Sequence, residues 1–289
     1  MTAFTLAILA VLLAGPVPEA MAGRAALRRT PWATMLLWQG VALAAVLSAL
    51  GAGLALVTDR AWRGEPDAVG LTVAAVALLV TGLVSVRLLL SGHRVGTSLR
   101  SLRRRHRRQV DLVAREERGV AVLEYDAPLA YCLPGLAKAR VVVSRGALGR
   151  LDTDEVAAVI AHERAHLRAR HDLVLEAFSV LHQAFPRWVS SRAALAEVGL
   201  LVEVLADRAA VRSVGARPLA RALVALADRE APEAMLGAGG SALTERVRLL
   251  ADTDPHPLQG ALVGLAGVGV VVLPTAFVAV PWLAGLAGA

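Results

Sequence analysis

Long apolar segments alternate with polar ones along the chain. Four segments reach the roughly 20 residues that an apolar helix needs to cross the hydrocarbon core of a bilayer. Each is rich in Leu, Val, Ala and Gly and nearly free of charge; they cover Ala3–Ala22, Ala33–Val57, Val69–Leu90 and Gly260–Leu286. The pattern therefore predicts a multi-pass membrane protein with three transmembrane helices in residues 1–91 and a fourth in residues 260–289. Buried core helices are the alternative for the middle two segments.

The more polar residues 92–259 form a predicted domain that is long enough to bury a core of its own. Short strands are predicted for VAVLEY, LAYCL and ARVVVS within residues 119–145, and PGLAK supplies the turn between the last two. The predicted helices are a basic helix over 97–118 that continues the third apolar segment, one beginning at Asp152 or Thr153, and three more over 195–214, 216–230 and 241–251. The expected fold class is mainly α, with a small sheet.

The distribution of charge predicts how the chain is oriented in the membrane. The chain is 56% hydrophobic and carries a net charge of +7. Arg24, Arg28 and Arg29 fall between the first two apolar segments, seven arginines fall within residues 94–110, and the loop at 58–68 is mixed in charge. Because Lys and Arg favour the cytoplasmic side, both termini should lie outside a plasma (inner) membrane, with residues 92–259 in the cytosol. The arginine run indicates an anchor on anionic lipid; direct nucleic-acid binding is the alternative, and no interleaved aromatic residues support it.

Two smaller features agree with this topology. Ala20-Met21-Ala22 resembles a signal-peptide cleavage site, but the leader MTAFT has no positive charge, so we expect the first helix to be retained. Cys132 is the single cysteine and cannot form an intramolecular disulfide, which suits a cytosolic domain.

The most polar part of a predicted helix is AVIAHERAHLRARHDL, residues 158–173. His162 and His166 are four residues apart and project from one helix face, as two ligands of a single zinc ion would. Glu163, beside the first histidine, is placed to act as a general base, which completes an H-E-x-x-H pattern. The alternative is a solvated face of histidines and arginines.

A catalytic zinc site keeps three protein ligands. The stretch VEVLADRAAV places Glu203 on an apolar helix, where a buried carboxylate is costly unless it is paired or binds a metal. Asp207 follows one turn later and can accept a hydrogen bond from a ligating histidine. Surface ion pairs with Arg208 or Arg212 are the alternative. The competing ligands are Glu197, Asp172, Glu176, His171 and His182. Of these, His171 and Asp172 are expected on the motif helix itself, too close to reach round to the metal.

H-E-x-x-H followed by E-x-x-x-D resembles the gluzincin metallopeptidases. The stretch ARVVVSRGALGRLDTDEVAAVIAHERAHLRARHDLVL looks like two membrane families of that kind, the HtpX-like peptidases and the BlaR/MecR antirepressors. Three apolar segments before the motif and one after it are similar to the BlaR/MecR arrangement. The BlaR/MecR sensors continue after the last segment into an external penicillin-binding domain, and we expect this chain to be a relative without that sensor.

The resemblance implies a zinc endopeptidase with a gluzincin-like α+β domain and one Zn²⁺ per chain. His162, His166 and Glu203 would bind the metal and Glu163 would be the base. Asp207 and His171 would support the ligands, and Arg246 would hold the substrate or the tetrahedral intermediate. ARVVVS or LAYCL would pair with a peptide substrate.

The implied substrate is a winged-helix repressor of the penicillinase type, and a homodimer is a further expectation. The alternatives are an HtpX-like quality-control protease and a catalytically inactive signalling scaffold.

Overall fold

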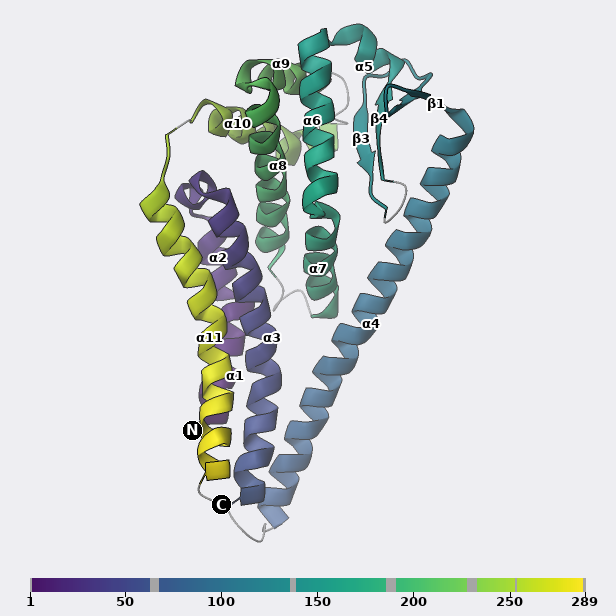
Figure 1. Cartoon of the computed structure of the whole chain (residues 1–289). Coiled ribbons are helices and arrows are strands. Elements are labelled where there is room, and N and C mark those ends of the chain that lie inside the picture. The colour runs from purple at the N-terminus through teal and green to yellow at the C-terminus, as the bar shows by residue number, and fades with distance from the viewer. Residues whose placement is uncertain are drawn as a thin grey trace. The chain divides into compact units, whose positions relative to one another are not determined.

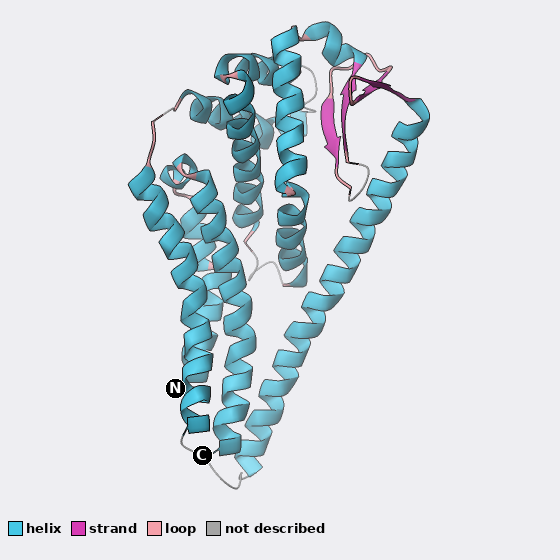
Figure 2. Ribbon diagram, in the orientation of Figure 1, coloured by secondary structure: helices cyan, strands magenta, loops and turns pink. Residues whose placement is uncertain are grey.

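The computed structural model describes residues 2–62, 68–135, 139–185, 191–227, 233–252 and 254–287. Helices dominate it, and the described strands form one sheet (Figure 2). The chain divides into two compact units. The first unit comprises Met1–Arg94, Phe178–Val198 and His256–Ala289, and the second comprises Val95–Ala177 and Gly199–Pro255. These boundaries lie close to the predicted domain limits at residues 92 and 259, but Phe178–Val198 joins the apolar helices.

The first unit contains the apolar helices. Four described helical segments are long and apolar enough to cross a membrane, namely Thr2–Ala22, Pro31–Thr58, Ala68–Val113 and Pro257–Val280. Each overlaps one of the four predicted segments, and the third runs on from Leu90 to Val113. The elements of this unit are α1 (Thr2–Ala14), α2 (Pro16–Ala22), the 3-10 helix η1 (Ala25–Arg29), α3 (Pro31–Trp62), the apolar part of α4 (Ala68–Val113) and α11 (Pro257–Ala287). Helix α3 packs against both α1 and α11 (Figure 1).

Glycines bring α3 and α11 close together. A Cβ added to Gly40 would collide with the carbonyl oxygen of Gly267, and one added to Gly267 would lie 3.0 Å from the Cα atom of Leu37. Small residues of this kind let apolar helices approach closely and gain van der Waals contact. The α3–α11 contact therefore depends on the absence of side chains at these two positions.

Arg87 is a charged residue within the apolar part of α4. Its guanidinium donates a 2.8 Å hydrogen bond to the carbonyl of Ala184, the last residue of α7 (His171–Ala184), and Ser91 donates a 2.8 Å bond to the carbonyl of Val180. The last carbonyls of a helix have no partner within the helix, so α4 caps the end of α7.

The predicted basic helix does continue the third apolar segment, but it ends earlier than the predicted residue 118. Helix α4 stops at Val113, and Ala114–Glu117 forms strand β1, antiparallel to β2 (Val120–Leu123). The two residues between the strands, Arg118 and Gly119, both have positive φ. Two-residue hairpin loops need that conformation, and the loop turns the chain back into the sheet.

The sheet of the second unit has the strand order β1-β2-β4-β3. Strands β3 (Ala130–Leu133) and β4 (Arg140–Ser144) are antiparallel, whereas β2 and β4 are parallel. All three predicted strands are present. Strand β4 is interior and β3 lies at one edge; residues 136–138 of the predicted PGLAK turn lie outside the described residues.

Side chains of the central strand alternate between the two faces of the sheet. Val142 packs on one face with Val110 of α4. Val141 and Val143 pack on the other face, in a cluster that includes Ile160 of the motif helix. The sheet is thus held between α4 and the helix that carries the histidines.

The remaining helices complete the second unit. They are α5 (Arg145–Arg150), α6 (Thr153–Ala169), the start of α7, most of α8 (Arg192–Val214), α9 (Ala216–Ala227) and α10 (Glu233–Ala251). Asp152 caps α6 through a 2.8 Å bond from the Glu155 amide, and the Glu155 carboxylate returns a 3.0 Å bond to the Asp152 amide. This capping box starts α6 at the predicted position.

Two predicted helix limits change. Helix α10 begins at Glu233, earlier than residue 241, and residues 228–230 of the helix predicted over 216–230 are not among those described. The motif helix ends at Ala169, because Arg170 adopts a left-handed conformation with φ 51° and ψ 43°.

Candidate metal centre

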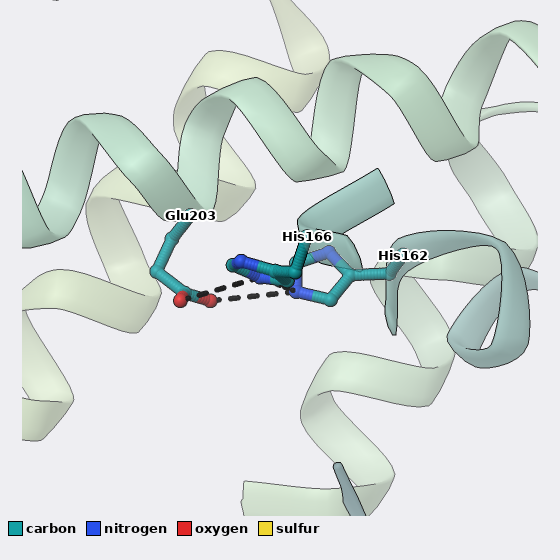
Figure 3. A group of neighbouring side chains, drawn as sticks. All are labelled: His162, His166 and Glu203. Carbon is teal, nitrogen blue, oxygen red and sulfur yellow. Dashed lines mark hydrogen bonds and ion pairs between the residues drawn. The ribbon is translucent and has the colours of Figure 1, made fainter. Parts of the chain in front are cut away.

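His162 and His166 project from the same face of α6, and α8 brings Glu203 opposite them (Figure 3). The two Nε2 atoms are 3.0 Å apart. Glu203 places one carboxylate oxygen 3.4 Å from Nε2 of His162 and the other 3.5 Å from Nε2 of His166. The ligand atoms of these three residues all lie within 4.8 Å of one another. Three polar side chains from two helices therefore converge on one point.

This donor set fits a zinc ion. Two imidazole nitrogens and one carboxylate oxygen are the ligands of one class of catalytic zinc site, which keeps a further position open. At zinc–nitrogen distances near 2.0 Å, two tetrahedral ligands would lie roughly 3.3 Å apart, close to the separation of the two Nε2 atoms here. The Glu203 side chain is 37% exposed, so solvent and a substrate can reach the centre.

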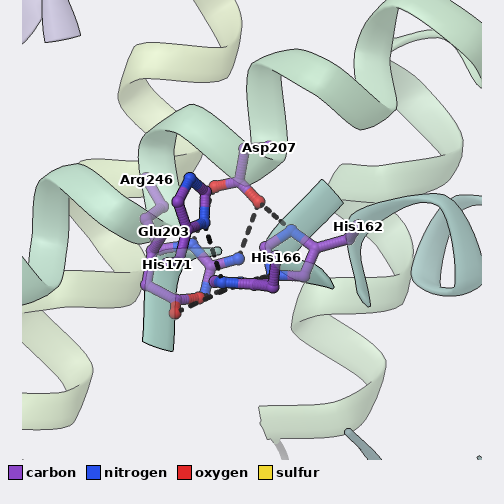
Figure 4. A network of polar contacts seen from close by, with 6 residues as sticks. All are labelled: His162, His166, His171, Glu203, Asp207 and Arg246. Carbon is purple, nitrogen blue, oxygen red and sulfur yellow. Dashed lines mark hydrogen bonds and ion pairs between the residues drawn. The ribbon is translucent and has the colours of Figure 1, made fainter. Parts of the chain in front are cut away.

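Asp207 and Arg246 contact the ligand residues His162 and Glu203 (Figure 4). An Asp207 oxygen lies 2.9 Å from Nδ1 of His162, which directs the other ring nitrogen towards the metal position. Arg246 donates hydrogen bonds of 2.8 Å from Nε and 2.7 Å from Nη2 to the two oxygens of Asp207. Its third nitrogen, Nη1, lies 3.0 Å from a carboxylate oxygen of Glu203. The guanidinium thus ties both acids of α8 together. Its predicted contact with a substrate stays a prediction.

His171 contacts His166 from a different helix, α7, and not from the motif helix as predicted. It lies on α7, and the left-handed Arg170 separates it from the motif helix, so the prediction that both share one helix is wrong. The two Nδ1 atoms of His171 and His166 are 3.0 Å apart (Figure 4). The break in the helix brings the His171 ring against the ring of His166, and its supporting role stays a prediction.

The two motif histidines differ in charge. Burial alone lowers the pKa of His162, but hydrogen bonds and charges from Asp207 and Glu203 outweigh it and raise the pKa to about 9. Burial lowers the pKa of His166 to about 4, and the attraction of Glu203 only partly opposes this. At neutral pH without metal, His162 is charged and His166 is neutral.

The acids also differ. Burial raises the pKa of Glu203 and Asp207, but His162 and Arg246 hold both carboxyl groups below their ordinary values. Burial raises the pKa of Glu163 above its ordinary value, and the charge of His162 offsets part of that rise. Glu163 is therefore the most basic of the three carboxylates, as a proton acceptor should be.

Cys132 is a neighbour of the site that the sequence did not reveal. Its thiol hydrogen-bonds to Glu163, and burial, followed by the charge of Glu163, raises the thiol pKa to about 12. The signal available in the sequence was its place in the LAYCL strand ahead of the motif. The contact puts the edge strand β3 beside the predicted general base.

The other competing ligands lie elsewhere, and three of them, Glu197, Asp172 and Glu176, pair with arginines. Glu197 pairs with Arg28 at 2.7 Å, and Arg103 approaches Asp172 and Glu176 at 3.3 Å and 3.5 Å. His182 lies on the wall of an apolar cavity in the first unit. The ion pairs of Glu203 and Asp207 are made with Arg246 and the histidines, and they replace the alternative pairs with Arg208 or Arg212.

An H-E-x-x-H motif on one helix, a third ligand, which is an acid, on a second helix and a flanking sheet are typical of the zinc metallopeptidases. The chain belongs to peptidase family M48, whose sequence model matches residues 98–261, more than half of its 289 residues. The comparisons with curated proteins and with solved structures gave no match. The M48 peptidases are zinc-dependent, in agreement with the donor set.

Proposed function

We propose that the protein is an integral membrane zinc endopeptidase. The observation that carries the proposal is the convergence of His162, His166 and Glu203, with the ligand atoms of all three within 4.8 Å of one another. The M48 family match and four helices long and apolar enough to cross a membrane support it. An inactive scaffold would have no chemical need for the complete set of ligands and base.

The protein side chains divide the work of hydrolysis. His162, His166 and Glu203 would hold the zinc ion, which supplies Lewis acidity at the scissile carbonyl. Glu163 takes the proton of the attacking water and gives it to the leaving amine, a role favoured by its raised pKa. Asp207 orients His162 and His171 orients His166, while Arg246 keeps the two acids of α8 in place.

Strand β3 offers a binding edge for an extended substrate. Strand β4 is paired on both sides, so the prediction that ARVVVS could pair with a peptide is wrong. LAYCL forms the edge strand, and its Cys132 contacts the general base. A peptide added to this edge would gain backbone hydrogen bonds and pass beside Glu163.

The proposed substrate is a cytosolic winged-helix repressor of the penicillinase type. Three long apolar helices before the motif and one after it, as in the BlaR/MecR antirepressors, support this choice. The arginine-rich loops support a cytosolic centre with both termini outside, in the plasma membrane. Membrane lipid and a second copy of the chain complete the proposed partners; a direct contact with nucleic acid is not proposed.

An HtpX-like quality-control protease is the second candidate, and the M48 family match is the observation that favours it. The two functions differ in selectivity. A repressor protease should cut one folded repressor at one position, whereas a quality-control protease should cut several misfolded membrane proteins at many. Mass spectrometry of the products from both kinds of substrate would separate them.

Metal analysis tests the core of the proposal. The purified wild-type protein should contain one zinc ion per chain, and Glu203→Ala should lose both zinc and hydrolysis of an unstructured peptide. Asp154→Ala, an exposed acid of α6, is the matched control and should keep both. Full zinc content and full activity in Glu203→Ala would remove Glu203 from the ligand set.

A further inference from the structure

The corner between α6 and α7 lies beside the metal centre, within the second unit. Arg170 forms this corner with a left-handed backbone, φ 51° and ψ 43°. Its N–H donates to the carbonyl of His166 at the end of α6, and its carbonyl accepts a 2.9 Å bond from the amide of Leu173 in α7. A left-handed arginine is unfavourable by itself, and such a conformation persists only where surrounding contacts hold it.

The corner decides where the His171 side chain points. On an unbroken α6, the five residues from His166 to His171 would rotate the chain by about 500°, which leaves the two side chains roughly 140° apart. They would then project from nearly opposite faces of the helix. In the structure the two Nδ1 atoms lie 3.0 Å apart and the rings are almost perpendicular, at 86° (Figure 4). The contact engages Nδ1 of His166 and leaves Nε2 for a metal ion.

A group of four charged residues surrounds the start of α7, and we call it the corner cluster: Arg103, Arg170, Asp172 and Glu176. Nε of Arg170 donates a 3.3 Å hydrogen bond to Oδ1 of Asp172, and Nη1 of Arg103 lies 3.3 Å from Oδ2. The same Nη1 donates a 3.5 Å bond to Glu176, one turn further along α7. The side chains of Arg103, Asp172 and Glu176 are at most 25% exposed, so salt screens these charges only weakly.

The corner cluster joins the polar end of α4 to the corner and to α7. Asp172 directly follows His171 in the chain, so contacts that fix this acid also fix the backbone of the histidine. We propose that the corner cluster is a positioning device for the metal centre. It holds the corner in the bent form in which His171 meets His166, and it makes zinc affinity depend on Arg103 of α4. This inference rests on the proposed zinc site and on the predicted role of His171.

Zinc affinity of the full-length protein in detergent tests this role, measured by competition with a chelator. Asp172→Ala and Arg103→Ala should each weaken zinc binding about 10-fold, the lower end of the loss seen when partners of metal ligands are removed. Arg103→Lys should stay close to the wild type, because both contacts come from the single atom Nη1 and an ammonium group can replace it. Arg104→Ala changes the next, exposed residue of α4 and is the matched control, with unchanged affinity expected.

A double-mutant cycle separates positioning from a general loss of structure. Because the corner cluster acts through His171, Asp172→Ala should weaken zinc binding in the wild-type background and add nothing in a His171→Ala background. Equal losses in the two backgrounds, or unchanged affinity in both, would overturn the positioning role, even if the unfolding temperature fell. If Asp172→Ala does not fold, Arg103→Ala takes its place in the same cycle.

The corner itself offers a matched pair of variants. Arg170→Gly and Arg170→Val both remove the side chain, but glycine adopts the left-handed conformation freely and a β-branched residue does not. The glycine variant should therefore bind zinc more tightly than the valine variant, and equal affinities would overturn the inference. A wild-type protein that binds no zinc would instead defeat the proposed function itself, so the two failures are distinguishable.

Discussion

His162 and His166 lie one turn apart on α6, yet their neighbours give them opposite charge states in the metal-free protein. Asp207 and Glu203 hold a proton on His162, whose pKa is about 9, whereas burial keeps His166 neutral with a pKa of about 4. A zinc ion can bind only the neutral form of either ring. Metal binding must therefore displace one proton from His162 and none from His166.

Zinc binding should accordingly release about one proton per chain at pH 7.5. The apparent affinity should rise about tenfold per pH unit and level off above pH 9, because the proton on His162 is then already lost. Calorimetric titrations in two buffers of different ionisation enthalpy measure the released proton directly. Asp207→Asn should reduce the release, since it removes an acid that raises the pKa of His162. No release at pH 7.5 would contradict the charge state assigned to His162.

Glu163→Gln should keep zinc and the fold but hydrolyse peptides about 10²–10⁴ times more slowly, because the amide cannot accept a proton. Single-turnover cleavage of a fluorescent peptide, together with metal analysis, measures both properties. Asp154→Asn on the same helix is the control and should behave as the wild type. Near-normal cleavage by Glu163→Gln would exclude Glu163 as the base.

The residues of the candidate site were largely predictable, because helical spacing alone places His162, Glu163 and His166 on one face. Glu203 and Asp207 followed from a costly position on an apolar helix. Cys132 could not be predicted, since its contact with Glu163 depends on how β3 packs beside α6. The pairing of Arg28 with Glu197 joins residues 169 positions apart, and no local pattern records it.

At the level of elements, close contact between α3 and α11 depends on glycine. A side chain at position 267 would meet the backbone of Leu37 at 3.0 Å, whereas one at Gly269 of the same helix would meet nothing within 4 Å. Backbone cannot move aside as a flexible side chain can. The two glycines thus provide a matched comparison within one helix.

Gly267→Leu should destabilise the packed helices by about 1–3 kcal/mol, the usual cost of overpacking. Gly269→Leu should be close to neutral. Thermal unfolding of both variants in the same detergent, with the wild type alongside, provides the comparison. Equal unfolding temperatures for the two variants would show that the α3–α11 contact contributes little.

Element types were more predictable than their ends. The four apolar helices and three of the strands follow from hydrophobic periodicity, and the Asp152–Glu155 capping box marks the start of α6. Strand β1 was missed because its sequence AREE is polar and continues a basic helix. The left-handed Arg170 was missed because nothing in its local sequence demands a break. Tertiary contacts decide where α4 and α6 end.

For the whole molecule, the distribution of arginine predicts which side of the membrane holds the metal centre. Alkaline phosphatase, which works only outside the cytosol, should be active when fused after Ala289 and inactive when fused after Arg150. The reason is that Lys and Arg in short loops favour the cytoplasmic side, and residues 94–110 hold seven arginines. The reverse pattern would place the centre outside and exclude a cytosolic repressor.

The 169 residues between Arg28 and Glu197 also separate the two in time. At a synthesis rate of about 5–20 residues per second, Arg28 is added to the chain roughly 8–34 s before Glu197. During that interval Arg28 has not yet met Glu197, and its positive charge takes part in orienting the first two helices in the proposed topology. Once α8 is made, the same side chain becomes a fixed contact. A single arginine thus serves first the insertion of the nascent chain and later the contact between η1 and α8 in the folded first unit, so a substitution there should disturb biogenesis and the stability of that unit by separate routes.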